Sequence, residues 1–320
     1  MGYNDDSFAI MLLTMALSPN REEYARPLNT QEFRRLEQRV RGSDMGRLGK
    51  LLGVDISGLM LKMDVDEQEA YRIFTLCNRG VQLTYALEGF YERGIRVVTQ
   101  SDGEYPQRLT KRLGEAAPPM FYAYGEGACS EKPKVAVVGI GGVRTTPEAR
   151  DAVETLVRNA GRLGYAVVTG GEPGVSHVAA GMAEEYGVEL IEILGGGMGQ
   201  RTAELAEAGE LAARCSGISL EHPDALFTIS HAITRNRVLF ALSDAAIVFN
   251  TDGKRGESEA IVHGYCDWIY AWRGHASTQG LIARGAYPID SFATLDMDQM
   301  ARDWRSSRAE QLSMFDLFGE

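Results

Sequence analysis

The residues of this 320-residue sequence that most clearly suggest a binding site are glycines that follow short apolar runs. They form three clusters, at Gly139, Gly141 and Gly142, at Gly170, Gly171 and Gly174, and at residues 195–197. Glycine lets backbone N–H groups approach an anion closely, and a helix that begins after such a turn presents its positive end to the same anion. The clusters therefore predict a site for phosphate.

The first cluster departs from the fingerprint of dinucleotide-binding proteins. Counting from Gly139 and Gly141, the third glycine of that fingerprint would fall at Arg144, and the second apolar run ends in Thr169-Gly170 without an acidic residue. These departures argue against a nicotinamide dinucleotide. Two interpretations stay open: the glycines bind a phosphate of another kind, or they serve only tight turns.

The candidate phosphate ligands among the side chains are Arg144, Arg235, Asn236, Arg237 and Lys254. Arginine offers phosphate oxygens a planar fork of donors. We expect a helix over residues 234–243, so Arg235 and Arg237 would lie at its start, where the helix dipole attracts anions. The alternative is that one of these arginines pairs with an acid such as Glu221 or Asp244.

The sequence contains no recognisable catalytic constellation. Ser176 and His177 are neighbours on an expected helix and point apart, and none of the five histidines is spaced as a metal ligand pair. Glu257 and Glu259 could bind ribose hydroxyls or act in glycosidic cleavage, but a capping or solvated role is the competing interpretation. We therefore expect no enzymatic activity, no metal and no cofactor.

Composition and charge narrow the function further. The chain carries 33 basic and 44 acidic residues, a formal charge of −11, with 44% hydrophobic and 24% charged residues. A protein that coats nucleic acid non-specifically is basic, because its affinity comes from cations that displace counterions. Any phosphate binding must therefore come from a few placed cations.

The cysteines and the apolar runs indicate in which cellular compartment the protein resides. The four cysteines form no C-x-x-C pair, which favours a reducing environment. The apolar stretch near the start has acidic flanks, unlike a secretory signal, and no run is long enough to span a membrane. We expect a soluble, cytoplasmic protein.

The elements that position the glycines follow from the pattern of apolar residues. Residues 1–95 read as helices, with Thr30 as a candidate cap, and a short strand is expected at 95–99. Strands are expected at 134–139, 165–171, 188–197, 217–221, 245–250 and 268–272. Helical segments separate most of them, which predicts an α/β protein with a doubly wound, mainly parallel sheet. The expected domains are 1–95 (helical), 96–290 (α/β) and 291–320 (a helix and tail).

An ordered set of motifs between residues 95 and 287 resembles the DNA-processing protein A family (DprA, also called Smf). The motifs are Tyr105-Pro106, Leu109, Pro118-Pro119, Phe121-Tyr122, Tyr124-Gly125, VAVVG at 135–139, Phe227, Arg235-Asn236-Arg237, Leu242-Ser243, AWRG at 271–274, Ser277, Gly280, Leu281-Ile282 and Gly285-Ala286. The resemblance implies an extended Rossmann fold with a SAM-like helical domain. It also implies a non-catalytic dimer that binds single-stranded DNA and hands it to a RecA-type recombinase. Arg235, Arg237 and Lys254 would then hold backbone phosphates.

Several positions differ from the family pattern. The arginine of the family's VGSR loop is displaced, and Arg144 is its only substitute; Ser176 stands where an aspartate is expected, and Glu172 adds a carboxylate at the pocket mouth. We therefore expect a divergent member that acts in DNA recombination or in phage defence. The alternative is an antitoxin-like partner that neutralises a phosphoribosyltransferase-like toxin or senses a nucleotide derivative.

The C-terminal tail contains a short peptide of separate interest. Its residues Gln311, Leu312, Met314 and Phe315 resemble the peptide with which bacterial replication proteins enter the sliding clamp. The alternative is that the apolar residues of the tail pack on the chain itself.

Overall fold

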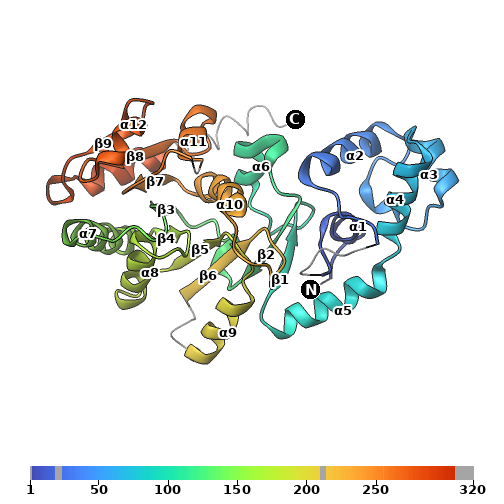
Figure 1. Cartoon of the computed structure of the whole chain (residues 1–320), viewed down its shortest axis with the longest axis horizontal. Helices are drawn as coiled ribbons and strands as arrows, with labels where there is room; N and C mark the ends of the chain where they lie inside the picture. Colours follow the sequence, from blue (N-terminus) through green and yellow to red (C-terminus); the bar gives the residue numbers. More distant parts are fainter. Residues whose placement is uncertain (1, 19–23, 210–213, 255, 307–320) are drawn as a thin grey trace. The chain divides into compact units, whose positions relative to one another are not determined.

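The computed structural model describes residues 2–18, 24–209, 214–254 and 256–306. Two compact units can be separated along the chain (Figure 1). Unit 1 comprises residues 1–124, 196–207 and 218–227, and unit 2 comprises residues 125–195, 208–217 and 228–320. The chain thus passes between the units several times. Unit 1 extends beyond the expected helical segment 1–95.

Unit 1 begins with helices that alternate with short turns, as the sequence predicts. Its elements are α1 (Asp5–Thr14), α2 (Thr30–Gly42), α3 (Ile56–Met63), α4 (Glu67–Cys77), α5 (Gly80–Glu92), β1 (Arg96–Thr99), α6 (Gln107–Leu113), β2 (Met120–Tyr124) and most of α9 (Gly199–Ala208). The α1 helix is the centre of the bundle, because Ala9 to Leu13 are at most 4% exposed. Their burial against the surrounding helices stabilises the bundle through the hydrophobic effect.

The start of α2 is held by a capping box rather than by the expected cap. Asn29, not Thr30, accepts a hydrogen bond from the backbone N–H of Glu32, and the Glu32 carboxylate accepts one from the Asn29 N–H. Glu32 also accepts hydrogen bonds from Arg26 and Arg72. Burial raises the pKa of Glu32, but the hydrogen bonds from Arg72 and Asn29 and the nearby guanidinium charges outweigh it, so the pKa lies below 4.5.

We expect Glu32→Gln to destabilise unit 1 at neutral pH by about 1 kcal/mol. A carboxyl whose pKa is lower in the folded state stabilises the fold above its unfolded pKa, and this contribution is lost as the pH falls through the folded pKa. The difference between wild type and variant should therefore shrink below pH 4.5. Urea unfolding followed by far-ultraviolet circular dichroism from pH 7 to 3 measures it. A difference that is constant with pH would contradict the assignment.

Unit 2 is built on a parallel sheet. Its strands are β3 (Lys134–Val138), β4 (Ala166–Thr169), β5 (Leu190–Leu194), β7 (Ala245–Val248), β8 (Trp268–Trp272) and β9 (Tyr287–Ile289). They are hydrogen-bonded in the order β5-β4-β3-β7-β8-β9, and every pair is parallel. With β1, β2 and β6 (Cys215–Ser219), the complete order is β1-β2-β6-β5-β4-β3-β7-β8-β9. This mostly parallel α/β sheet confirms the predicted fold class.

Helices lie along the strands of unit 2 and bury them. They are α7 (Pro147–Leu163), α8 (Val175–Glu185), α10 (Ile229–Leu242), α11 (Glu257–His263) and α12 (Gln279–Ile282). All five residues of β3 are buried, as expected for a strand covered on both faces. Residues 297–306 are helical, and the Trp304 indole packs edge-on against Tyr165 and donates a hydrogen bond to the Tyr270 hydroxyl.

Two strands were not predicted from the sequence. Residues 120–124 are apolar or aromatic throughout and were interpreted as the approach to the first strand, but they form β2, antiparallel to β1. Strand β9 contains Pro288, and a proline is compatible with a strand only at a sheet edge, where β9 lies.

None of the helices within the described ranges has the length and apolar character needed to cross a membrane. The predicted clamp-binding residues 311–315 lie outside the described residues.

Candidate phosphate-binding rim

Two of the three predicted glycine clusters meet at the carboxyl ends of β3 and β4, together with the loop that follows β7. We call this edge the rim, formed by residues 139–146, 170–174, 249–254 and 256. The third predicted cluster, at residues 195–197, follows β5 instead, and Gly196 and Gly197 there pack closely against the backbone of Phe227 and Pro223. The Gly142 N–H donates to the Pro173 carbonyl at 3.0 Å, which joins the first two loops. The Ile140 N–H donates to Asn250 Oδ1 at 2.7 Å, which joins the first loop to the third. The carboxyl edge of a doubly wound sheet is where ligands of such folds bind.

Glycine is required at two positions of the rim for different reasons. At Gly139 an added Cβ would lie 2.3 Å from a methyl carbon of Val175, so a side chain would push β3 away from α8. At Gly174 the backbone has φ of +116°, which other residues rarely adopt. Gly174 precedes α8, and no side chain caps that helix. The positive end of α8 thus adjoins two glycine loops.

Arg235 does not lie on the rim surface, which corrects the expectation that it holds a phosphate. Its side chain is 2% exposed and pairs with Glu172 at 2.8 Å. Its Nη1 also donates to the carbonyls of Gly170 and Ile193. The Arg235 guanidinium therefore connects the carboxyl ends of β4 and β5 through hydrogen bonds to their backbone carbonyls. The alternative drawn from the sequence, that one of these arginines pairs with an acid, is correct for Arg235. The acid is Glu172, however, rather than Glu221 or Asp244.

Gly170 and Arg235 depend on each other. A Cβ at residue 170 would come within 2.1 Å of Arg235 Nη1, so only glycine leaves room for the guanidinium. Asn236 is also buried, at 4% exposure, and lies next to Gly256. Arg235 and Asn236, the first two residues of the Arg235-Asn236-Arg237 triplet, are therefore buried side chains that support the rim from the protein interior.

The triplet lies in the middle of α10 rather than at its start. The helix begins at Ile229, and its N-terminus is capped by the Thr228 side chain, which accepts from the His231 N–H. The helix predicted from the sequence begins at residue 234, which is five residues after the observed start at Ile229. The helix dipole acts on the first turn, so it gives no special attraction for anions at residues 235–237.

Three of the predicted cations are accessible. Arg144 is exposed in the first loop, and Lys254 is exposed in the third. Arg237 is about one-third exposed and pairs with Glu259 at 3.0 Å. The rim thus offers backbone amides, one uncapped helix end and three cationic side chains.

The acids near the rim are engaged. Glu259 pairs with Arg237 and also accepts a hydrogen bond from the Tyr265 hydroxyl. Burial, together with the charge of Glu259, raises the pKa of Tyr265. Glu257 is 2% exposed. Within the described part of the chain, no cluster of three or more His, Cys, Asp or Glu side chains could hold a metal ion.

Phe227 is one of the residues that resemble the DprA family, and its position in that pattern indicates no role by itself. The residue lies in unit 1 just before α10 and is 51% exposed, and its neighbour Leu226 is 84% exposed. An added Cβ at Gly196 would lie 3.0 Å from the Phe227 amide nitrogen, so this glycine lets the two segments pack closely. An exposed aromatic ring is a stacking surface for a nucleic-acid base. The feature of the sequence that could have drawn attention to Phe227 is its place among the motifs that resemble the DprA family.

The fold is a Rossmann-like α/β fold, and the rim at its carboxyl edge carries glycine loops and exposed cationic side chains. The model of the family described as DNA recombination-mediator protein A matches residues 96–291. The chain belongs to this family. No curated protein matches the sequence.

Solved structures of the same fold include two DNA processing proteins A. The protein from Streptococcus pneumoniae is 18% identical, with a TM-score of 0.59 over 92% of this chain and 97% of that chain. The protein from Helicobacter pylori, described for its single-stranded DNA binding mode, is 21% identical, with a TM-score of 0.52 over 66% of this chain and 98% of that chain. The first likeness extends over unit 1 as well as unit 2.

Proposed function

We propose that this protein binds single-stranded DNA at the rim without cleaving it and delivers the strand to partner proteins in DNA recombination. The observation that carries the proposal is the placement of Arg144, Arg237 and Lys254 around glycine loops and the uncapped end of α8. Family membership and the ssDNA-binding description of the Helicobacter pylori protein support the same function.

The physical basis is local attraction within an anionic molecule. A net charge of −11 repels polyanions at long range, so the three cations and the backbone amides must supply the affinity at short range. A binding mode with few phosphate contacts has a shallow but measurable salt dependence, about 0.7 in the slope of log affinity against log salt for each contacted phosphate.

Titration of the full chain into a fluorescein-labelled 20-mer of deoxythymidine, at 50 and 200 mM salt, tests the proposal. We expect saturable binding whose affinity falls about twenty-fold between these concentrations for three phosphate contacts. The same 20-mer paired with its complement should bind more weakly. Undetectable binding, or binding that does not change with salt, would reject the proposal.

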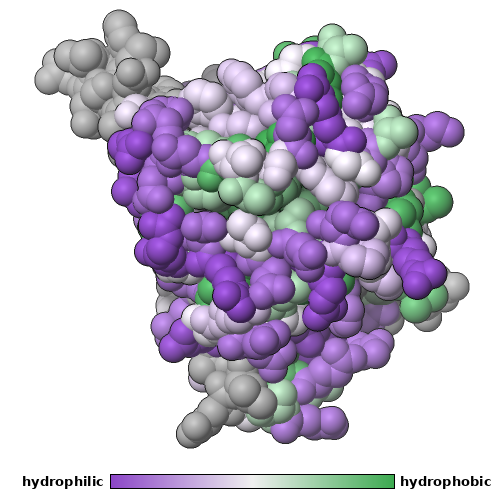
Figure 2. Space-filling view, turned by 90° about the vertical axis from the view of Figure 1, so that its left-hand side faces the viewer, coloured by the Kyte–Doolittle hydropathy of each residue, from purple (hydrophilic) through white to green (hydrophobic). Residues whose placement is uncertain are grey.

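One edge of the sheet supports the prediction that the protein forms a homodimer. Strand β9 forms one edge of the sheet, and Tyr287 on it is 47% exposed and packs on Trp268 with ring centroids 5.2 Å apart. Figure 2 shows a mostly hydrophilic face with less polar residues gathered near its middle. We propose this edge as the contact with a second copy.

The remaining partners stay predictions. They are a RecA-type recombinase, the sliding clamp and a toxin neutralised in phage defence. The antitoxin alternative gains no specific observation from the rim, and neither does glycosidic cleavage by Glu257 or Glu259.

A further inference from the structure

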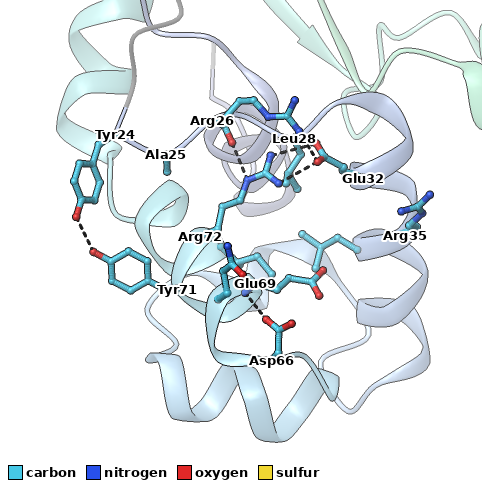
Figure 3. Close-up of a pocket in the computed structure, with 13 residues that line it drawn as sticks. Tyr24, Ala25, Arg26, Leu28, Glu32, Arg35, Asp66, Glu69, Tyr71 and Arg72 are labelled. Atoms are coloured by element: carbon cyan, nitrogen blue, oxygen red, sulfur yellow. Dashed lines mark hydrogen bonds and ion pairs between the residues drawn. The ribbon is translucent and has the colours of Figure 1, made fainter.

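A cavity lies in unit 1, within the helical bundle. It has a volume of about 580 Å³, within the range of small-ligand pockets, and residues of the segment before α2, of α2 itself and of α4 line it (Figure 3). Leu28, Leu36 and Ile73 also border it, but they are only 9%, 2% and 1% exposed, so they belong to the core beneath the cavity. The cavity belongs to neither the rim nor the α/β sheet, and the proposed DNA binding does not use it.

Most of the charged groups of this cavity are satisfied within the protein. Arg72 donates to the carbonyls of Arg26 and Pro27 and to the Glu32 carboxylate. The other carboxylates are engaged too, because Glu69 pairs with Arg39, and Asp66 accepts from the Glu69 N–H.

Arg35 is the exception. Its guanidinium is exposed and lines the cavity, and it makes no hydrogen bond or ion pair with the described residues. On the opposite side of the cavity, Tyr24 and Tyr71 lie with their hydroxyls 3.1 Å apart (Figure 3). Tyr24 is 87% exposed and Tyr71 46% exposed. The cavity thus offers one uncommitted cation and an aromatic wall.

We propose that this cavity binds a peptide segment of a partner protein in which an acidic side chain lies close to an aliphatic one. The carboxylate would pair with Arg35, and the aliphatic side chain would pack against the rings of Tyr24 and Tyr71. Tyrosine and arginine dominate the energetics of protein interfaces. A DNA strand fits less well, because the lining holds three arginines against three acids and so carries no net positive charge.

A library of random dodecapeptides displayed on phage, selected on the full chain, tests the proposal. We expect enriched peptides to share an Asp or Glu within a few positions of Leu, Ile or Val. The best peptide, labelled and titrated, should bind at least ten-fold more weakly to Arg35→Glu and to Tyr71→Ala. Changing its acid to Lys should restore binding to Arg35→Glu, because the charge pair is reversed. Lys62→Glu makes the same charge change on α3 away from the cavity and should leave peptide binding intact.

The two proposed activities are separated by the oligonucleotide titration on the same variants. Arg35→Glu should bind the deoxythymidine 20-mer as the wild type does, with an unchanged melting temperature. Failure to enrich an acidic and aliphatic consensus, or peptide binding indifferent to Arg35→Glu, would overturn the peptide site. A ten-fold loss of oligonucleotide affinity in Arg35→Glu would overturn it as well, and would assign the cavity to nucleic acid.

Discussion

Replacing Arg144, Arg237 and Lys254 together by glutamine should reduce the affinity for single-stranded DNA about a thousand-fold. Each charge-assisted hydrogen bond to phosphate is worth about 1.5 kcal/mol at the low end, so three sum to about 4.5 kcal/mol if they act independently. The salt slope should become shallower by about 2, which is about 0.7 for each lost contact. Anisotropy titrations at several salt concentrations give both quantities.

A matched triple variant controls for net charge. Arg158, Arg302 and Arg305 are exposed in unit 2, and Arg305 donates to the Leu163 carbonyl, beyond the amino end of β4 and away from the rim. Their replacement by glutamine removes the same charge and should change the affinity less than five-fold. Equal losses in the two triple variants would mean that the general field of the protein, and not the rim, determines binding.

Glu259→Gln should act in the opposite direction. The carboxylate holds Arg237 at 3.0 Å and competes with phosphate for it. Its removal should raise the affinity about three-fold, because an ion pair whose members are about one-third exposed is worth about 0.7 kcal/mol. A loss of affinity would contradict the assignment of Arg237 as a phosphate ligand.

Arg235→Met should destabilise unit 2 by about 3–5 kcal/mol. Removing one partner of a buried ion pair leaves the other charge without compensation, which costs far more than the pair itself contributes. Here Glu172 would lose its guanidinium partner, and the carbonyls of Gly170 and Ile193 would lose a donor. All three tryptophans (Trp268, Trp272 and Trp304) lie in unit 2, so tryptophan fluorescence during urea unfolding reports on this unit.

Two companion variants identify the cause of that loss. Adding Glu172→Gln to Arg235→Met removes the stranded charge and should recover about half of the lost stability. Arg237→Met, two residues further along the same helix but one-third exposed, should cost less than about 1 kcal/mol. If the single variants at 235 and 237 were equally stable, the buried role of Arg235 would be incorrect.

The sequence determined the sheet and the loops of unit 2 with little error. Apolar runs at 134–139 and 245–250 contain β3 and β7, and the glycines after them lie on the rim. A parallel strand buried on both faces leaves a continuous apolar run, and a tight turn demands glycine, so both signals are local. The strand at 120–124 was missed because its pairing with β1 depends on a distant segment rather than on an alternating pattern.

Only the tertiary structure decided what each arginine does. Arg235 and Arg237 are alike in sequence context, but they lie about 200° apart around α10, so one faces the strand ends and the other the surface. Burial of Arg235 follows from the space left by Gly170 and from Glu172, which is 63 residues away along the chain. Charge pairing between such distant positions depends on how the strands are ordered in the sheet, and no local pattern of residues records that order.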